Sequence, residues 1–204
     1  MFMIRNVIFD FGKVLVDYDF DLLMEKLYPP QKRRPVYDFV MEQKRRDSFD
    51  LGFKPFEEII ADYAGEFPEI GQELLLFGKR KYEVVLGEMP GMKDLLKRLK
   101  AGGYKLYGLS NWDTQVYITM EQYDIFDLLD GRIISCEEHA VKPGPEIYRR
   151  LFDRYSLAPQ ECVFVDDKLP NIKGAENVGM RAVLFKDAAQ LEKELCYICE
   201  VQNF

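Results

Sequence analysis

The sequence contains few of the residues that build disulfide frameworks and zinc sites. It has four cysteines and one histidine among 204 residues. So few cysteines do not form a disulfide framework, and Cys162 lies in an apolar run where a buried thiol is expected. Cys196 and Cys199 have the spacing of a redox or zinc motif, but no second pair accompanies them, and His139 has no second histidine. We therefore expect a reduced, cytoplasmic protein.

Long apolar runs and an excess of basic residues are missing as well. No apolar segment approaches the length of a membrane-spanning helix, and the N-terminal stretch lacks the separate charged and apolar regions of a signal peptide. The chain has 35 acidic and 28 basic residues, which gives a net charge of −7. A nucleic-acid partner is disfavoured because phosphate contacts need a basic face. We expect neither a membrane nor a nucleic acid as partner.

The first part of the chain combines one short strand with a long helical segment. Residues 7–9 are apolar and meet Asp10 and then Gly12, which is typical of a buried parallel strand that ends in a functional acid. From Tyr18 to about Gly87 apolar residues recur at helical spacing, and no strand is expected there. The spacing predicts four helices, the second of which ends near Asp47.

Strands alternate with helices from residue 88 onward. The predicted strands are residues 104–109, 132–135, 162–165 and 181–185, and the predicted helices are residues 92–101, 114–122, 146–155, 171–178 and 188–195. This alternation predicts an α/β fold with a doubly wound parallel sheet. Residues 1–16 and 88–204 are expected to form this core. Residues 17–87 are expected to form a small helical-bundle domain inserted into it.

Polar residues follow the predicted strands at the edge where such sheets bind ligands. They are Asp10, Ser110, Asn111, Lys142, Asp166 and Asp167. Three carboxylates close together repel one another, so a divalent cation is needed, and an all-oxygen ligand set favours Mg²⁺. Lys142 and Ser110 can hold the oxygens of a phosphoryl group. The sequence therefore predicts a magnesium site that accepts a phosphate.

Each of these residues also has a simpler interpretation. The aspartates can cap helices or lie in solvated turns, Ser110 can cap the helix after it, and Lys142 alone would be an ordinary surface lysine. Basic runs such as residues 44–46 are most often solvated helix faces. Arg45 or Arg46 can instead reach a substrate, and Trp112 is either a packing anchor or a pocket wall.

Four segments in this order resemble the motifs of the haloacid dehalogenase (HAD) superfamily of hydrolases. Residues 7–12 (VIFDFG), 109–111 (LSN), 142–148 (KPGPEIY) and 163–172 (VFVDDKLPNI) resemble its first to fourth motifs. The resemblance covers essentially the whole chain and implies a Rossmann-like core. The helical segment is similar to the cap of that family, which closes over the site and selects substrate.

The resemblance also implies roles for individual residues. Asp10 would be the nucleophile that forms an aspartyl-phosphate, and Lys142 would neutralise the charge that develops. Mg²⁺ would be bound by Asp10, by the backbone carbonyl of Gly12 and by Asp166 and Asp167. The residues implied to bind the phosphate are Ser110, Asn111 and Lys142.

Gly12 departs from the pattern of the family's phosphatases. These usually carry at that position a second aspartate, which protonates the leaving oxygen and later activates water. Asp17, Asp19 or a cap residue would then have to supply the proton. A branch resembling α-glucose-1-phosphate phosphatase shares the glycine, and the anomeric oxygen of its substrate leaves easily.

The sequence is compatible with three functions. The first is a Mg²⁺-dependent phosphatase for a small phosphorylated metabolite, with a sugar phosphate as the expected class. The second is a catalytically weak binding or regulatory module for a phosphorylated ligand, which only Gly12 supports. The third is a 2-haloacid dehalogenase, which the pair Asp166 and Asp167 disfavours because dehalogenases of this superfamily use no Mg²⁺.

Overall fold

A five-stranded parallel sheet forms the centre of the molecule in the computed structural model, which describes residues 3–199. The strands lie in the order β5 (Gly131–Ile134), β4 (Lys105–Ser110), β1 (Asn6–Phe9), β6 (Cys162–Asp166) and β7 (Arg181–Leu184). All four strand pairs are parallel, so the predicted doubly wound fold is confirmed. β1 is the central strand, and its carboxyl end lies between those of β4 and β6.

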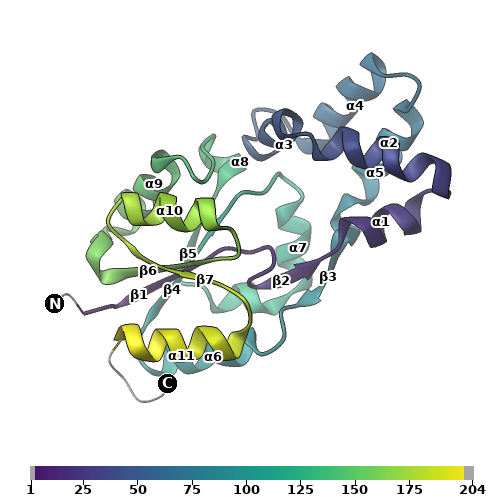
Figure 1. Ribbon diagram of the computed structural model, residues 1–204. Helices are drawn as coiled ribbons and strands as arrows, with labels where there is room; N and C mark the ends of the chain where they lie inside the picture. Colours follow the sequence, from purple (N-terminus) through teal and green to yellow (C-terminus); the bar gives the residue numbers. More distant parts are fainter. Residues whose placement is uncertain (1–2, 200–204) are drawn as a thin grey trace.

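Helices cover both faces of this sheet (Figure 1). On one face lie α6 (Met92–Ala101) and α11 (Ala188–Cys199), and on the other lie α9 (Pro145–Tyr155) and α10 (Leu169–Asn177). Val7 and Phe9 belong to the hydrophobic cluster that includes α6 and α11, whereas Ile8 belongs to the cluster on the α9 side. Because successive side chains of a strand point to opposite faces, and both faces are covered, Val7, Ile8 and Phe9 must all be apolar.

The expected helical segment lies beyond one end of the sheet (Figure 1). It consists of α1 (Phe20–Leu27), α2 (Pro30–Met41), α3 (Gln43–Asp50), α4 (Phe56–Glu66), α5 (Gly71–Arg80) and a 3₁₀ turn η1 (Lys81–Val84). The predicted second helix is wrong as a single element, because the backbone leaves the helical region at Glu42 (ψ 130°) and starts α3 anew. Pro29 and Pro30 separate α1 from α2 as expected.

Two short strands join this segment to the sheet domain. β2 (Val16–Tyr18) pairs antiparallel with β3 (Val85–Glu88), and Asp17 lies opposite Gly87. The expectation that no strand occurs between Tyr18 and Gly87 is therefore wrong, because runs of three or four residues are too short to show a strand period. Both predicted domain boundaries fall within this pair of strands, and the division into two domains stays a prediction.

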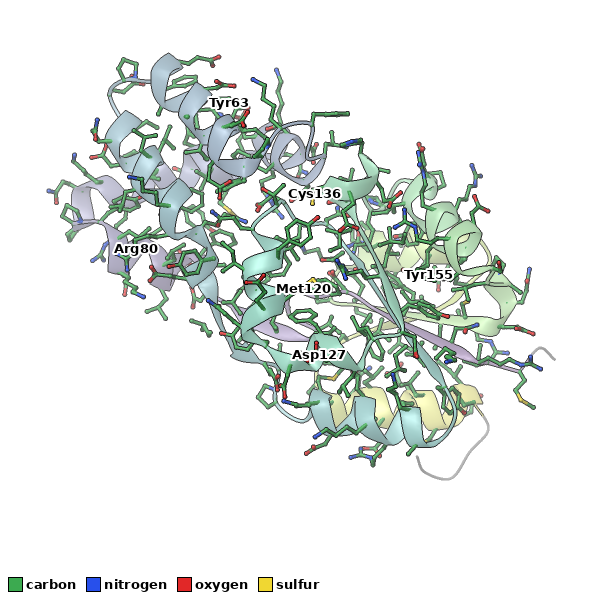
Figure 2. All side chains as sticks on the ribbon, turned by 180° about the vertical axis from the view of Figure 1, so that it is seen from behind. Tyr63, Arg80, Met120, Asp127, Cys136 and Tyr155 are labelled. Carbon is green, nitrogen blue, oxygen red and sulfur yellow. The ribbon has the colours of Figure 1, made fainter. Side chains whose placement is uncertain are left out.

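The helical segment also touches the sheet domain beside α8 (Ser135–Glu138). Gly52 has a positive φ of 62°, and a Cβ atom there would lie 2.5 Å from the Cα atom of Cys136. His139 Nδ1 lies 2.7 Å from the Leu51 carbonyl oxygen, and its ring stacks on Phe53 at 4.7 Å. Figure 2 shows Cys136 at this junction. His139 thus holds two parts of the chain together.

The remaining elements are short. They are α7 (Val116–Gln122) and the 3₁₀ turns η2 (Asp124–Leu128) and η3 (Pro159–Glu161). Among residues 3–199, no helix has both the length and the apolar character needed to cross a membrane.

The absence of a side chain at Gly108 supports the packing next to Asp10. A Cβ atom there would lie 2.8 Å from Phe11 Cζ and 3.2 Å from Leu129 Cδ1, and Phe11 is fully buried. Gly108→Ala is expected to lower the free energy of unfolding by about 1–3 kcal/mol, because the core has no room for the methyl group. Urea denaturation measures the loss. The control is Gly65→Ala, where no atom lies within 4 Å of the added carbon; equal stability of both variants would contradict this packing.

Candidate functional site

The carboxyl ends of three neighbouring strands bring the predicted residues together. Asp10 follows β1, Ser110 ends β4 and Asp166 ends β6. Asp10, Ser110, Lys142 and Asp166 are all buried. An oxygen atom from each of Asp10, Asp166 and Asp167 lies within 4.8 Å of the others. The structure therefore collects the acids and the lysine at one rim, as the strand order requires.

The ammonium group of Lys142 lies between two of these carboxylates. Its Nζ atom is 2.9 Å from Asp10 Oδ1 and 2.7 Å from Asp166 Oδ2, and it donates to the Leu109 carbonyl oxygen at 2.8 Å. Burial lowers the pKa of Lys142, but Asp10 and Asp166 outweigh burial and raise it overall. Lys142 is therefore a buried permanent cation, not a surface lysine.

Asn111 holds the backbone of Lys142 in place. Its Oδ1 atom accepts from the Lys142 backbone N–H at 2.8 Å, and its Nδ2 donates to the Lys142 carbonyl oxygen at 3.0 Å. These contacts are with the protein, whereas the sequence had suggested Asn111 as a phosphate-binding residue. Asn111 also lines the cavity described below, so its role toward a phosphate stays a prediction.

The two adjacent aspartates after β6 have different surroundings. Asp166 accepts hydrogen bonds from Lys142 Nζ, from the Lys168 backbone N–H at 2.8 Å and from Asn171 Nδ2 at 3.0 Å. Asp167 Oδ1 is buried and has no hydrogen-bond partner. Asp166 is thus satisfied by protein donors, whereas Asp167 has a free oxygen beside Asp10.

Burial dominates the electrostatics of these acids. It raises the pKa of Asp10 to about 6, with Lys142 opposing the rise and Asp166 adding to it. Burial likewise raises the pKa of Asp167. A buried carboxylate is costly unless a cation lies beside it. The free oxygen of Asp167 and the all-oxygen donor set therefore fit a hard divalent cation at this rim.

Gly12 leaves space that another residue occupies. A Cβ atom on Gly12 would lie 2.6 Å from Tyr18 Cε1 and 3.2 Å from Tyr18 Cδ1. Any side chain at position 12 would thus require the Tyr18 ring to move. In the sequence, Gly12 stands where an acid is usual. In the structure, the Tyr18 ring packs against this glycine.

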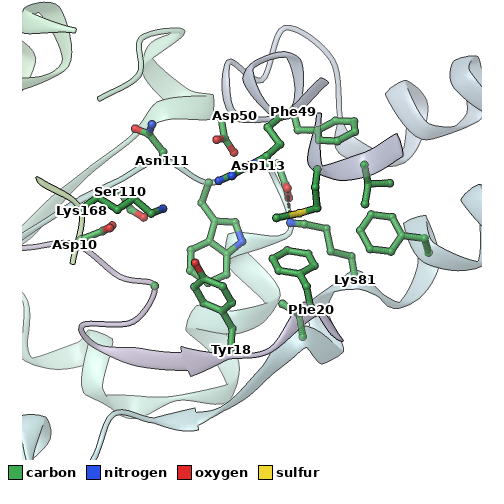
Figure 3. Close-up of a pocket in the computed structure, with 17 residues that line it drawn as sticks. Asp10, Tyr18, Phe20, Phe49, Asp50, Lys81, Ser110, Asn111, Asp113 and Lys168 are labelled. Atoms are coloured by element: carbon green, nitrogen blue, oxygen red, sulfur yellow. Dashed lines mark hydrogen bonds and ion pairs between the residues drawn. The ribbon is translucent and has the colours of Figure 1, made fainter. Parts of the chain in front are cut away.

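One cavity connects the rim with the helical segment (Figure 3). From the sheet domain it is lined by Asp10, Gly12, Ser110, Asn111, Trp112, Asp113 and Lys168, and from the helical segment and its connecting strands by Tyr18, Phe20, Arg46, Asp50, Lys81 and several apolar residues. Trp112 therefore lines the pocket and also packs against the hydrophobic core. Ser110 does not cap α7, which has Gln115 at its N-cap, and its buried Oγ has no partner.

The structure separates the two candidate arginines. Arg45 pairs with Glu42, and its guanidinium lies 3.6 Å from the centre of the Phe39 ring. Arg46 lines the cavity. Sequence reasoning did not identify Tyr18, Asp50, Lys81 and Asp113 as site residues. Asp113 had a positional signal, three residues after Ser110 at a strand end, and Asp50 had one too, because a cap residue was already expected as an alternative proton donor.

Lys142→Met is expected to destabilise the protein by about 3–5 kcal/mol at neutral pH, because two buried carboxylates lose their cation. Loss of Lys142 raises the pKa of Asp10 further above the 3.8 of the unfolded chain. The folded variant then holds a proton that the unfolded chain releases. The loss in free energy of unfolding is therefore small near pH 4 and grows as the pH rises. Urea denaturation with a chelator at several pH values measures it.

The control is Lys105→Met. Lys105 is exposed and lies 3.4 Å from Asp130, so its loss should cost little at any pH. Equal effects of the two substitutions would contradict a buried charge cluster at the rim.

Comparisons with known proteins agree with this geometry. A glyceraldehyde 3-phosphate phosphatase of Pyrococcus furiosus is 26% identical over 212 residues, which cover 95% of this chain and 85% of that protein. A D-ribitol-5-phosphate phosphatase of Bacteroides thetaiotaomicron is 26% identical over 211 residues, which cover 96% of this chain and 98% of that protein.

The fold has a similar solved counterpart. A HAD family enzyme of Bacteroides thetaiotaomicron, crystallised with magnesium and inorganic phosphate, has a TM-score of 0.73 and 20% sequence identity over 91% of this chain and 96% of that chain. At this identity the likeness shows the fold alone. The family model described as haloacid dehalogenase-like hydrolase matches residues 4–179. The chain therefore belongs to the haloacid dehalogenase-like hydrolases.

Proposed function

We propose that this protein is a Mg²⁺-dependent phosphatase that hydrolyses a small phosphorylated metabolite through an aspartyl-phosphate on Asp10. The observation that carries the proposal is the buried rim itself. There the buried carboxylate of Asp10, the fixed ammonium group of Lys142 and an unpaired carboxylate oxygen of Asp167 lie together. The curated relatives named as phosphatases support the same reaction class.

The residues proposed to hold the cation are Asp10, the backbone carbonyl of Gly12 and Asp167. We assign Asp167 as the direct carboxylate ligand because both oxygens of Asp166 already accept from protein donors. Asp166 then acts by holding Lys142 in place. The cation, when bound, supplies positive charge that makes the approach of a phosphate dianion to the carboxylates favourable.

The chain's own residues carry the steps of the reaction. A carboxylate oxygen of Asp10 attacks phosphorus, and the bond to the leaving oxygen breaks. Lys142 keeps its charge throughout and offsets the charge on Asp10 and on the phosphoryl oxygens. The unpartnered hydroxyl of Ser110 donates to a phosphoryl oxygen. Water then attacks the aspartyl-phosphate and releases phosphate.

A sugar or sugar-alcohol phosphate is the proposed substrate class. The cavity presents polar groups from the helical segment, Arg46 and Asp50 among them, that can bind hydroxyl groups beyond the phosphate. The names of the two relatives, which act on a triose phosphate and a pentitol phosphate, support this class. A panel of phosphorylated sugars that includes 1-phosphates tests it. Binding without turnover of any ester would favour the binding-module alternative.

Asp10→Asn is expected to lower the turnover of 4-nitrophenyl phosphate by at least about a thousandfold, because the amide cannot attack phosphorus. The substitution keeps the shape of the side chain, so circular dichroism should report an unchanged fold. Release of nitrophenol with Mg²⁺ present measures the activity. Full activity of a folded Asp10→Asn variant would exclude Asp10 as nucleophile.

Asp167→Asn is expected to raise the Mg²⁺ concentration for half-maximal activity by about tenfold or more, because a direct ligand is lost. Asp166→Asn should instead lower kcat with a smaller shift in Mg²⁺ requirement, because it disturbs Lys142. A chelator should abolish turnover, and added Mg²⁺ should restore it. The same Mg²⁺ requirement in both variants would contradict the assignment, and activity unchanged by chelator would exclude the metal.

A further inference from the structure

A phosphatase with glycine at position 12 still needs a group that protonates the leaving oxygen. This argument rests on the function proposed above. The Tyr18 ring fills the space beside Gly12. No acidic side chain can therefore lie in that space and act as the proton donor. The donor must therefore come from another element that lines the cavity.

The acids suggested by sequence are engaged elsewhere. Asp17 accepts from Lys13 Nζ at 2.6 Å and from the Tyr18 backbone N–H at 2.8 Å. Asp19 caps α1 by accepting from the Leu22 backbone N–H at 2.9 Å. Neither residue lines the cavity. Both carboxylates serve local structure at the start of the helical segment.

Three acids line the cavity, and only one is both free and outside the rim. Asp10 is the proposed nucleophile, and Asp113 is paired with Lys81 and accepts from the Gln115 backbone N–H at 3.0 Å. Asp50 is the last residue of α3, and its carboxyl group makes no hydrogen bond or ion pair with any described residue. Figure 3 shows Asp50 on the cavity wall that the helical segment supplies, with Asp10 and Ser110 on the sheet side.

We propose that Asp50 is the proton donor and acceptor that replaces the acid missing at Gly12. In the first step the bond from Asp10 to phosphorus forms, the ester P–O bond breaks, and the leaving oxygen takes the proton of Asp50. In the second step water attacks phosphorus and gives a proton to Asp50. The bond to Asp10 then breaks and phosphate leaves. The cycle consumes one water and returns both carboxyl groups to their starting states.

The charges around Asp50 agree with this role. Burial raises the pKa of Asp50 to about 7, Asp113 adds to the rise, and Lys81, Arg46 and Lys168 oppose it. These four charged residues act on Asp50 from the loop after β4, from η1, from α3 and from the loop after β6, and the Cys136 thiol interacts with it from α8. A group that exchanges its proton near neutral pH suits a general acid that later acts as base.

The test compares two kinds of leaving group in Asp50→Asn. An alkoxide needs a proton to leave, whereas 4-nitrophenolate does not. The probes are 4-nitrophenyl phosphate and the faster of D-ribitol 5-phosphate and glyceraldehyde 3-phosphate. The quantity measured is kcat/KM, because it reports only the steps up to and including release of the alcohol. The variant should lose about a hundredfold or more on the alkyl ester and little on the aryl ester.

The pH profile supplies a second readout. For the wild type, the ratio of alkyl to aryl kcat/KM should fall as the pH rises through about 7, because Asp50 loses its proton. Protein groups that act in both reactions cancel in this ratio, whereas the second ionisations of the two esters differ and do not cancel. In Asp50→Asn the ratio should be low and should follow only the ionisation of the esters. A fall of the ratio through pH 7 in the variant as well would overturn the role of Asp50.

Asp47→Asn is the matched control. Asp47 lies on the same helix, accepts from Gln43 Nε2 at 2.6 Å and does not line the cavity with Asp10. The Asp47→Asn variant should have the kcat/KM of the wild type on both esters. Equal losses on both esters in Asp50→Asn, or a loss confined to the alkyl ester in Tyr18→Phe instead, would overturn the proposal. If the wild-type protein cleaves only the aryl ester, the proposed role of Asp50 is overturned as well. If it cleaves none of the esters, the proposed phosphatase function is contradicted.

Discussion

The position of the Lys142 ammonium between Asp10 and Asp166 is the interaction on which the rest of the site depends. Two buried carboxylates this close would repel strongly, and neither could stay ionised without a cation. Lys142 is held from both ends, by the carboxylates at its Nζ atom and by Asn111 at its backbone. Asp10, the proposed nucleophile, can therefore be a carboxylate although it is buried. Asp167 Oδ1 is buried and accepts no hydrogen bond, which is why we propose it as a ligand of the metal.

The strand order explains why these residues meet. β1 lies between β4 and β6, so residues more than 150 positions apart in sequence lie side by side at one rim. The side chains of β1 pack on both faces of the sheet, and a shift of the strand by one residue would turn Asp10 away from the rim. The helical segment closes the opposite side of the cavity and is tied on by β2 and β3 and by the contact of Gly52 with Cys136.

Much of this could be predicted from sequence because it depends on local pattern. Asp10, Ser110 and Asp166 each end an apolar run, and the carboxyl ends of parallel strands share one edge of the sheet. β2 and β3 are too short for a period to appear, and Glu42 interrupts the predicted helix with neither glycine nor proline. Asp166 and Asp167 are adjacent, so only the hydrogen bonds of the folded chain distinguish them. Tyr18 and Asp50 enter the site through packing between distant segments, which no periodicity encodes.

The contact between Tyr18 and Gly12 changes how the glycine is interpreted. The chain has no acid at position 12, the Tyr18 ring packs there instead, and the helical segment brings the carboxyl group of Asp50 to the same cavity. The central claim is that Asp10 is phosphorylated during turnover. Mass spectrometry of protein quenched within one turnover tests it most directly. The account predicts one added phosphoryl group, confined to the peptide that contains Asp10 and absent from Asp10→Asn. Product formation from protein that stays unmodified, or a phosphoryl group on another peptide, would contradict it.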